Sequence, residues 1–344
     1  PVANVTLTFS SSDATEVLLS DSSCSTATPM VQFVMDPGNW STGFNLTVCG
    51  VVDHVDDGDT SSQVVVDCSS QDPLYEGHTF NTSVEVLDID AAAIFSSPSS
   101  DVGDVSENGT MTSFGIWLGT IPMSNVSLTL TINDATECSF TDASRLLNMD
   151  DPTSNTIIPG GAAVTELTLL FGPETARIPQ LVAIQGVDDY MDDGDQPCRV
   201  DITSIESADF RYGDMLLSTQ EDREVESDTL YYILNFDDDE AGAELAPLAL
   251  TISETDAKMD PPLSHIAGVR LRSEPLAPPV NVRFWSTNTA EGLSEGVLSF
   301  DGTNWREPQP VPVLAVDDYR ADGDVEFTIA FGLAESDGPD YSGT

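Results

Sequence analysis

The most regular pattern in the chain is an apolar run, then a loop rich in aspartate and glycine, then a run of alternating apolar and polar residues. In the middle of the chain the apolar run Leu181–Ile184 leads into the loop Gly186–Asp195, and Arg199–Ile202 follows. The loops Val51–Asp59 and Val316–Asp324 have the same surroundings. Two β-type runs joined by Asp and Gly predict a hairpin, with glycine supplying the positive φ of the turn.

This loop marks an internal repeat. Its glycine recurs as Gly58, Gly194 and Gly323, which lie 136 and 129 residues apart, so the chain is built from repeats of about 130 residues. Around each loop lie many short β-type runs separated by turn residues. They predict an all-β fold of tandem immunoglobulin-like β-sandwiches. The predicted repeats are residues 1–90, 91–239 and 240–344.

The two outer sandwiches are predicted to be incomplete. Repeat one has no counterpart of the first strands, which end at Glu107 in repeat two and at Glu254 in repeat three. Repeat three has no counterpart of the last strands of the other repeats, Ser83–Leu87 and Leu230–Leu234. An open sheet edge accepts a further strand. We therefore expect either that the chain is a window on a longer array or that neighbouring subunits exchange strands.

Composition narrows the range of partners. The chain has 40% apolar residues, which is enough for sandwich cores, and 59 acidic against 11 basic residues, a net charge of −48. That charge argues against nucleic acid and anionic membranes as partners and favours divalent cations. No run of 18 apolar residues and no signal peptide occurs. We expect a soluble chain without membrane insertion, as a mature or excised piece.

The use of asparagine points to the extracellular space. Every asparagine before residue 130 lies in an N-x-S/T sequon, and none of the seven later ones does. Apolar residues alternate along the strand that follows Asn4, so Asn4 is expected to face solvent, as a glycan acceptor must. Asn39 has an equivalent outside any sequon, Asn304, and alternatively makes a turn. The candidate sites of N-linked glycans are Asn4, Asn39, Asn45, Asn81, Asn108 and Asn125.

The five cysteines suit an oxidising compartment. Cys49 and Cys68 lie nine and ten residues on either side of Gly58, and a hairpin centred there would bring them within disulfide reach. Cys138 and Cys198 are the two cysteines of repeat two. We predict Cys49–Cys68 and Cys138–Cys198 disulfides. The alternatives are a bond from Cys24 to Cys49 or Cys68, and five buried thiols.

Trp40 and Trp305 occupy equivalent places, each 18 residues before the glycine of its loop. The equal spacing favours a core residue in each repeat, with repeat two packing differently around Arg177. The alternative is a pair of aromatic platforms that stack on sugars.

Further motifs recur in a fixed order with the loop. First strands end in Ser106-Glu107 and Ser253-Glu254, and repeat two closes with the acidic segment 237–242. Together with the loop aspartates, these motifs resemble the Calx-β repeat over nearly all of repeats two and three and the last two thirds of repeat one. The resemblance implies a seven-stranded immunoglobulin-like sandwich. In calcium-binding members, acidic residues gather at the end where each domain meets the next.

Carried over residue by residue, the resemblance implies calcium ligands in repeats two and three. In repeat one His54 stands at the second aspartate position of the loop, and the glutamate of the first strand is missing, which argues against calcium there. The alternative is that these loops are solvated turns. The candidates in repeat two are Glu107, Asp134, Asp188, Asp189, Asp192, Asp195, Asp237, Asp238 and Asp239. Those in repeat three are Glu254, Asp317, Asp318, Asp322 and Asp324.

These features favour a structural role over catalysis. No Ser/His/Asp arrangement, phosphate-binding loop or HExxH motif occurs, and the carboxylate pairs recur in every repeat, unlike a single catalytic site. We expect an extracellular filament or surface-fibre subunit, glycosylated and stiffened by calcium, which joins other copies of itself head to tail in a helical assembly. The alternative is a calcium-dependent cell-adhesion or carbohydrate-binding surface protein.

Overall fold

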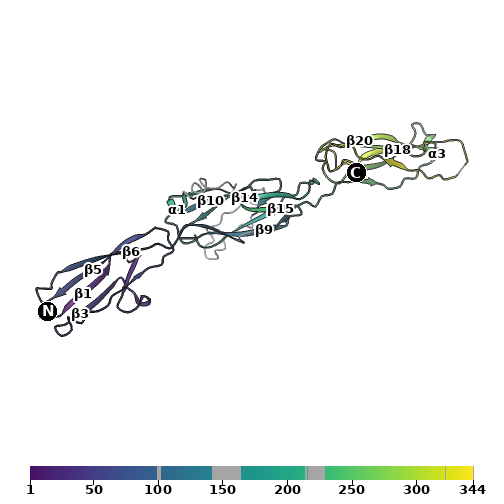
Figure 1. Cartoon of the computed structure of the whole chain (residues 1–344). Coiled ribbons are helices and arrows are strands. Elements are labelled where there is room, and N and C mark those ends of the chain that lie inside the picture. Colours follow the sequence, from purple (N-terminus) through teal and green to yellow (C-terminus); the bar gives the residue numbers. More distant parts are fainter. Residues whose placement is uncertain (99–101, 142–163, 214, 216–228, 322, 344) are drawn as a thin grey trace.

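The computed structural model describes residues 1–98, 102–141, 164–213, 215, 229–321 and 323–343. It is almost entirely β-structure, arranged as three β-sandwiches that follow one another along a rod (Figure 1). Every sheet draws its strands from one of three stretches, 5–86, 94–236 or 243–331. The predicted all-β fold of tandem sandwiches is confirmed. None of the helices in the described ranges could span a lipid bilayer.

Repeat two is the fullest sandwich. Alternating burial along β10 turns Val126, Leu128, Leu130 and Ile132 into the core, as expected for a strand with one face against a second sheet. One sheet has the order β12 (Glu166–Phe171), β10 (Val126–Ile132), β14 (Gln196–Ser207), β15 (Thr229–Phe236), β8 (Val105–Ser106). The facing sheet has the order β11 (Cys138–Phe140), β13 (Gln180–Gly186), β9 (Met111–Leu118), β7 (Ile94–Ser97). The short helix α1 (Phe210–Gly213) follows β14.

Repeat one repeats this plan with fewer strands. Its larger sheet has the order β3 (Met30–Met35), β1 (Val5–Ser11), β5 (Thr60–Ser70), β6 (Thr79–Val86). Its second sheet consists of β2 (Val17–Ser20) and β4 (Thr47–Gly50), beside the 3-10 turn η1 (Cys24–Thr26). In repeat two the corresponding sheet also contains β9 and β7, which have no counterparts here among the described residues. The buried core cluster of repeat one is correspondingly small: Val17, Leu19 and Val64.

Repeat three lacks strands at its other edge. One sheet has the order β16 (Ala243–Ala246), β17 (Ser264–Leu271), β21 (Gln309–Ala315), β19 (Gly292–Leu293). The other has the order β20 (Glu295–Phe300), β18 (Val280–Ser286), β22 (Ile329–Phe331). Within the described part of repeat three, no strand follows β22 to take the place of β15. The short helix α3 (Glu254–Ala257) stands where repeat two has the end of β8.

The Asp/Gly loops are not hairpins. In repeat one, β4 before the loop pairs with β2, whereas β5 after it pairs with β1 and β6 of the facing sheet. The loop therefore crosses from one sheet to the other, and the same holds for β13 to β14 in repeat two. The hairpin prediction is wrong because alternation reveals which face of a strand is buried but not which strand lies beside it.

This crossing changes one of the two predicted disulfides. Cys68 lies opposite Leu7 in the larger sheet, while Cys49 lies in the smaller one. Cys49 instead bonds Cys24, with Cα atoms 5.6 Å apart, and Cys68 is a buried thiol. The Cys49–Cys68 prediction is wrong, whereas Cys138–Cys198 is present and joins the two sheets of repeat two.

The missing strand of repeat one also changes the environment of its tryptophan. Trp305 is only 7% exposed, and its carbonyl accepts a hydrogen bond of 2.9 Å from the N–H of Leu271, the last residue of β17. Trp40 has no such strand over it in the described structure and is 56% exposed, so the prediction of a core residue is wrong there. In repeat two the equivalent carbonyl is that of buried Ala176, not Arg177, and it accepts from the N–H of Leu118 (2.8 Å).

Candidate metal centre

The three Asp/Gly loops share an unusual backbone conformation. His54, Tyr190 and Tyr319 have φ values of 67°, 68° and 62°, a left-handed region that non-glycine residues rarely enter. The aspartate before each of them accepts a hydrogen bond from the N–H two residues further on: Asp53 from Val55, Asp189 from Met191 and Asp318 from Arg320. His54 is thus the counterpart of Tyr190, and the residue of repeat one at the Asp188 position is Val52.

The first acidic cluster lies where repeat two ends. Glu107 follows β8, and its N–H donates to the carbonyl of Phe236 (3.1 Å), which holds it beside the segment after β15. Oxygens of Glu107, Asp237 and Asp239 lie within 4.8 Å of one another. Glu107 is buried, with 4% of the residue exposed. Three carboxylates at this separation repel one another unless protons or a cation neutralise them.

The electrostatics of the cluster show that repulsion. Burial, with the charges of Asp189 and Asp237 beside it, raises the pKa of Glu107 to about 8. Burial and the neighbouring aspartates, Asp188 first, raise the pKa of Asp239 to about 6. Glu107 Oε2 and Asp239 Oδ2 are buried and find no hydrogen-bond donor among the described residues. Two unpaired oxygens that face the same acidic cluster are an arrangement that a hard cation relieves.

A second cluster lies next to the first. Glu137, Asp189 and Asp193 also bring oxygens within 4.8 Å of one another. Burial raises the pKa of both Glu137 and Asp193. Asn235 Nδ2 donates to Glu137 Oε2 (3.2 Å), and Asp193 Oδ1 is buried without a donor in the described structure. Asp189 belongs to this cluster, and its charge also acts on Glu107, so the two clusters form one acidic centre.

The remaining loop aspartates accept hydrogen bonds from the backbone of the segment that connects repeats two and three. Asp192 Oδ2 accepts from the N–H of Ala241 (2.7 Å), and Asp195 Oδ1 accepts from that of Asp237 (3.3 Å). Asp237 Oδ2 in turn accepts from the N–H of Gly194 (2.8 Å). Asp134 lies outside both clusters and accepts from Thr136. These hydrogen bonds set the geometry of the junction, and Asp237 takes part both in them and in the first cluster. Glu107 Oε2, Asp193 Oδ1 and Asp239 Oδ2 accept no hydrogen bond within the described residues and remain available to an ion.

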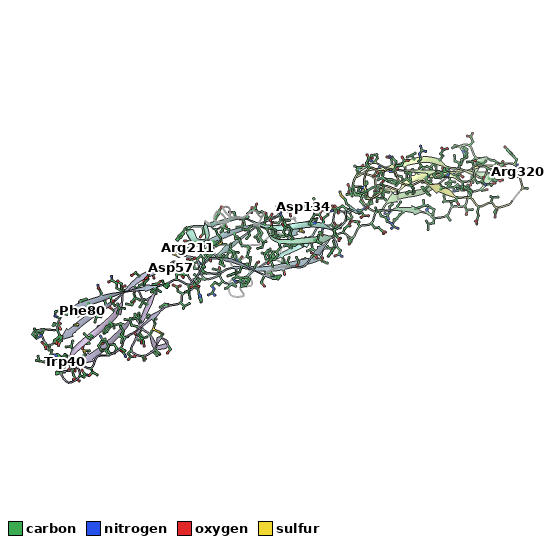
Figure 2. The ribbon with its side chains drawn as sticks, in the orientation of Figure 1. Trp40, Asp57, Phe80, Asp134, Arg211 and Arg320 are labelled. Atoms are coloured by element: carbon green, nitrogen blue, oxygen red, sulfur yellow. A yellow bond between two sulfur atoms is a disulfide. The ribbon has the colours of Figure 1, made fainter. Side chains whose placement is uncertain are left out.

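Repeat one contains the equivalent of the second cluster. Glu16, Asp53 and Asp57 lie within 4.8 Å of one another, and burial raises the pKa of Glu16 and of Asp57. At the same junction Arg211 of repeat two places Nη1 3.2 Å from Asp56 Oδ1, and Figure 2 shows Arg211 and Asp57 where the first two sandwiches meet. The junction thus has a guanidinium of its own and three clustered carboxylates.

The described part of repeat three does not assemble a cluster of three carboxylates. Lys258, directly after α3, places Nζ 2.8 Å from Asp317 Oδ2, and this amine holds the pKa of Asp317 below its usual range. Asp318 interacts with Arg320, Asp324 is exposed and Glu254 lies in the first turn of α3. Asp322 lies outside the described residues. The described carboxylates of this repeat therefore form no group of three that could hold an ion.

The structure adds Glu16, Glu137 and Asp193 to the predicted ligand set. The two glutamates close the recurring sequence Asp-Ala-Thr-Glu, at 13–16 and 134–137. This recurrence is the sequence signal for both glutamates: the last residue of the motif joins a cluster, whereas in repeat two its first residue, Asp134, holds the turn. Asp193 shares its loop with four other aspartates, so the local sequence does not single it out.

No family model and no curated protein matches the chain. Solved structures give distant similarities. The calcium binding domain CBD12 of CALX1.1 is 15% identical, with a TM-score of 0.29, over 72% of this chain and 83% of that one. CBD12 from CALX1.2 is also 15% identical, with a TM-score of 0.28 over 72% of this chain and 83% of that one. Domains 4–9 of the surface layer protein SbsC give 11% identity and a TM-score of 0.24 over 94% of this chain and 36% of that one.

Proposed function

We propose that the chain is an extracellular structural glycoprotein, a subunit of a filament or surface fibre whose repeat junctions are stiffened by calcium. The observation that carries the proposal is the open core of repeat one. An apolar groove of about 480 Å³ lies there, lined by residues that include Val5, Leu7, Trp40, Tyr75 and Phe80. In repeat two, β9 fills the equivalent space with Phe114, Ile116 and Leu118, all buried.

The groove keeps the hydrogen-bonding groups that a strand would use. In repeat two the hydroxyl of buried Tyr212 bonds Thr120, just beyond β9. Its counterpart Tyr75 is 37% exposed, and its hydroxyl makes no hydrogen bond within the described structure. The outer edge of β4 is likewise unpaired in the described part of repeat one. A strand supplied by a neighbouring copy would satisfy these groups, and a head-to-tail contact propagates into a fibre.

Calcium fits the acidic centre of repeat two. Ca²⁺ takes 6–8 oxygen ligands, and the two clusters offer carboxylates from four separate segments: the ends of β8 and β15, the crossing loop and the turn before β11. Glu107, Asp237, Asp239, Glu137, Asp189 and Asp193 would hold the ion or ions. The ion would supply the positive charge that the unpaired oxygens lack. Because Asp237 and Asp239 lie in the connection to repeat three, calcium there would stiffen the rod.

The six sequons suit glycosylation. All six asparagines are exposed, and they spread over repeat one and the first third of repeat two. The side-chain oxygen of Asn39 accepts a hydrogen bond from the N–H of Asp36 (2.7 Å), so Asn39 also stabilises the turn in which it lies.

Electron microscopy of the purified chain, with calcium and after chelation, tests the proposal. We expect filaments with calcium, and thinner or more flexible assemblies after chelation. Dispersed monomers at every protein concentration, in both conditions, would refute the fibre.

A second candidate, a carbohydrate-binding or adhesion protein, is favoured by one observation. Trp40 presents an exposed ring at one tip of the rod (Figure 2), and exposed aromatic faces stack on sugars. Glycan-array binding that disappears in Trp40→Ala, by a chain that does not polymerise, would favour this candidate.

A further inference from the structure

The junction between repeats two and three is an aromatic clamp. The carbonyl of Tyr190 accepts a hydrogen bond from the N–H of Glu274 (2.8 Å), and the rings of Tyr190 and Trp305 lie 6.4 Å apart. The guanidinium of Arg306 covers both rings, 4.5 Å from the centroid of Tyr190 and 4.8 Å from that of Trp305. The tyrosine comes from the crossing loop of one repeat, and the other three residues belong to the next repeat.

The junction between repeats one and two uses the same backbone contact. The carbonyl of His54, the counterpart of Tyr190, accepts from the N–H of Ile121 (2.8 Å). Asp56 Oδ2 accepts from the N–H of Ala92 (2.8 Å), as Asp192 Oδ2 does from Ala241. One docking mode therefore occurs twice in the chain: the residue with positive φ in one repeat receives an N–H of the next.

Among the described residues, each end of the rod carries one half of this clamp without its partner half. Tyr319 has the same positive φ as Tyr190 and is 90% exposed in the loop of repeat three. At the opposite tip Trp40 is exposed in a turn equivalent to that of Trp305: the N–H of Trp40 donates to Asp36 O and that of Trp305 to Asp301 O, both 3.1 Å. Figure 2 places Trp40 at one end of the molecule and Arg320, the neighbour of Tyr319, at the other.

At the two tips the arginine is on the tyrosine side, whereas between repeats two and three it is on the tryptophan side. Repeat one has Ser41 where repeat three has Arg306, so the tryptophan tip lacks its guanidinium. The loop of repeat three has Arg320 where that of repeat two has Met191, and this arginine is exposed. An aromatic pair and one cation are thus present again when both tips are taken together. This complementarity between opposite ends of one chain points to a second copy as the partner.

We propose that the Tyr319 loop of one copy docks on the Trp40 tip of a second copy and reproduces the clamp between repeats two and three, with Arg320 as its cation. The contact joins different surfaces of two copies, so it leaves a free tip at each end and continues to add subunits. It rests on the proposed fibre and names the surface that holds subunits together.

Complementary single variants test the contact by sedimentation velocity in the presence of calcium. Trp40→Ala keeps a Tyr319 tip and Tyr319→Ala keeps a Trp40 tip. Each variant alone should be at least about tenfold weaker in self-association than the wild type, as expected for loss of an aromatic anchor. Mixed in equal amounts, they retain one good contact per pair, so they should form a dimer of one copy of each and stop there.

Matched controls replace exposed aromatic residues away from both tips. Trp285→Ala on β18 and Tyr232→Ala on β15 should associate like the wild type. If the wild type polymerises and the two tip variants polymerise equally well, the clamp is refuted while the fibre stands. If the wild type stays monomeric at every concentration, the fibre fails, and the clamp fails with it.

Discussion

Replacing Glu107 by glutamine separates the cost of its buried charge from its value as a metal ligand. Without calcium the pKa of this carboxyl is about 8 in the folded chain, raised by burial and then by Asp189, against an ordinary 4.5. The folded state therefore binds the proton more tightly than the unfolded chain does. Between these two pH values the unfolded chain is ionised and the folded chain is protonated, so stability falls as pH rises.

The size of the effect follows from the shift. Each pKa unit corresponds to about 1.36 kcal/mol, so the wild type without calcium should lose roughly 5 kcal/mol of repeat-two stability from this group as pH rises from about 4.5 to about 8. Glutamine does not titrate, so Glu107→Gln should lose far less over the same range. At pH 8 the chelated variant should be the more stable protein. Calcium should reverse this order, because a neutral amide is a weaker ligand than a carboxylate.

Calorimetry in chelator and in calcium, at several pH values, measures this crossover. Hydrogen exchange of β8 and β15 assigns it to repeat two. Glu166→Gln, which replaces an exposed carboxylate on β12 of the same repeat, is the control. It should leave the stability almost unchanged both in chelator and in calcium. If Glu107→Gln is less stable than the wild type both with and without calcium at pH 8, the carboxylate has another structural role and the metal-centre reasoning is wrong.

Three further predictions follow. Tyr212→Phe should cost about 1–2 kcal/mol in chemical denaturation, since it removes a buried hydroxyl with several partners, whereas Tyr75→Phe should be neutral; equal effects would contradict the open groove. A non-reducing peptide map should link Cys24 to Cys49 and leave Cys68 free, alkylated only after unfolding; a peptide linking Cys68 to another cysteine would overturn the pairing. Glycopeptide mass spectrometry should find glycans on at least four of the six exposed sequons, and fewer would weaken the extracellular assignment.

Much of the fold could be predicted from the sequence because its signals are local. The alternation of apolar residues in stretches such as Val126–Ile132 fixes a strand and its buried face without reference to any partner. The recurrence of the Asp/Gly loop gave the repeats, and comparison of the three copies gave the strands missing from the outer two. The exposure of a sequon asparagine beside a strand, such as Asn4, follows from the same alternation.

The acidic centre was predictable only in part. Glu107, Asp189, Asp237 and Asp239 could be named from motif order, and the structure brings them together. The sequence does not distinguish Glu137 from Asp134, because both are acidic and they lie three residues apart. Only the turn before β11 decides which of the two reaches the loop, and Asp134 is used to hold that turn.

Strand pairing, and the burial of residues outside the alternating strands, were decided by tertiary structure. The loop Val51–Asp59 has a turn composition that fits a hairpin or a crossing between sheets, and the requirement to close a core between two sheets selects the crossing. That choice moves Cys49 away from Cys68 and beside Cys24. Likewise Trp40 and Trp305 have equal local sequence signals, but only Trp305 has a strand packed over it. A side chain is buried by its neighbours in space, and the local pattern does not record whether those neighbours are present.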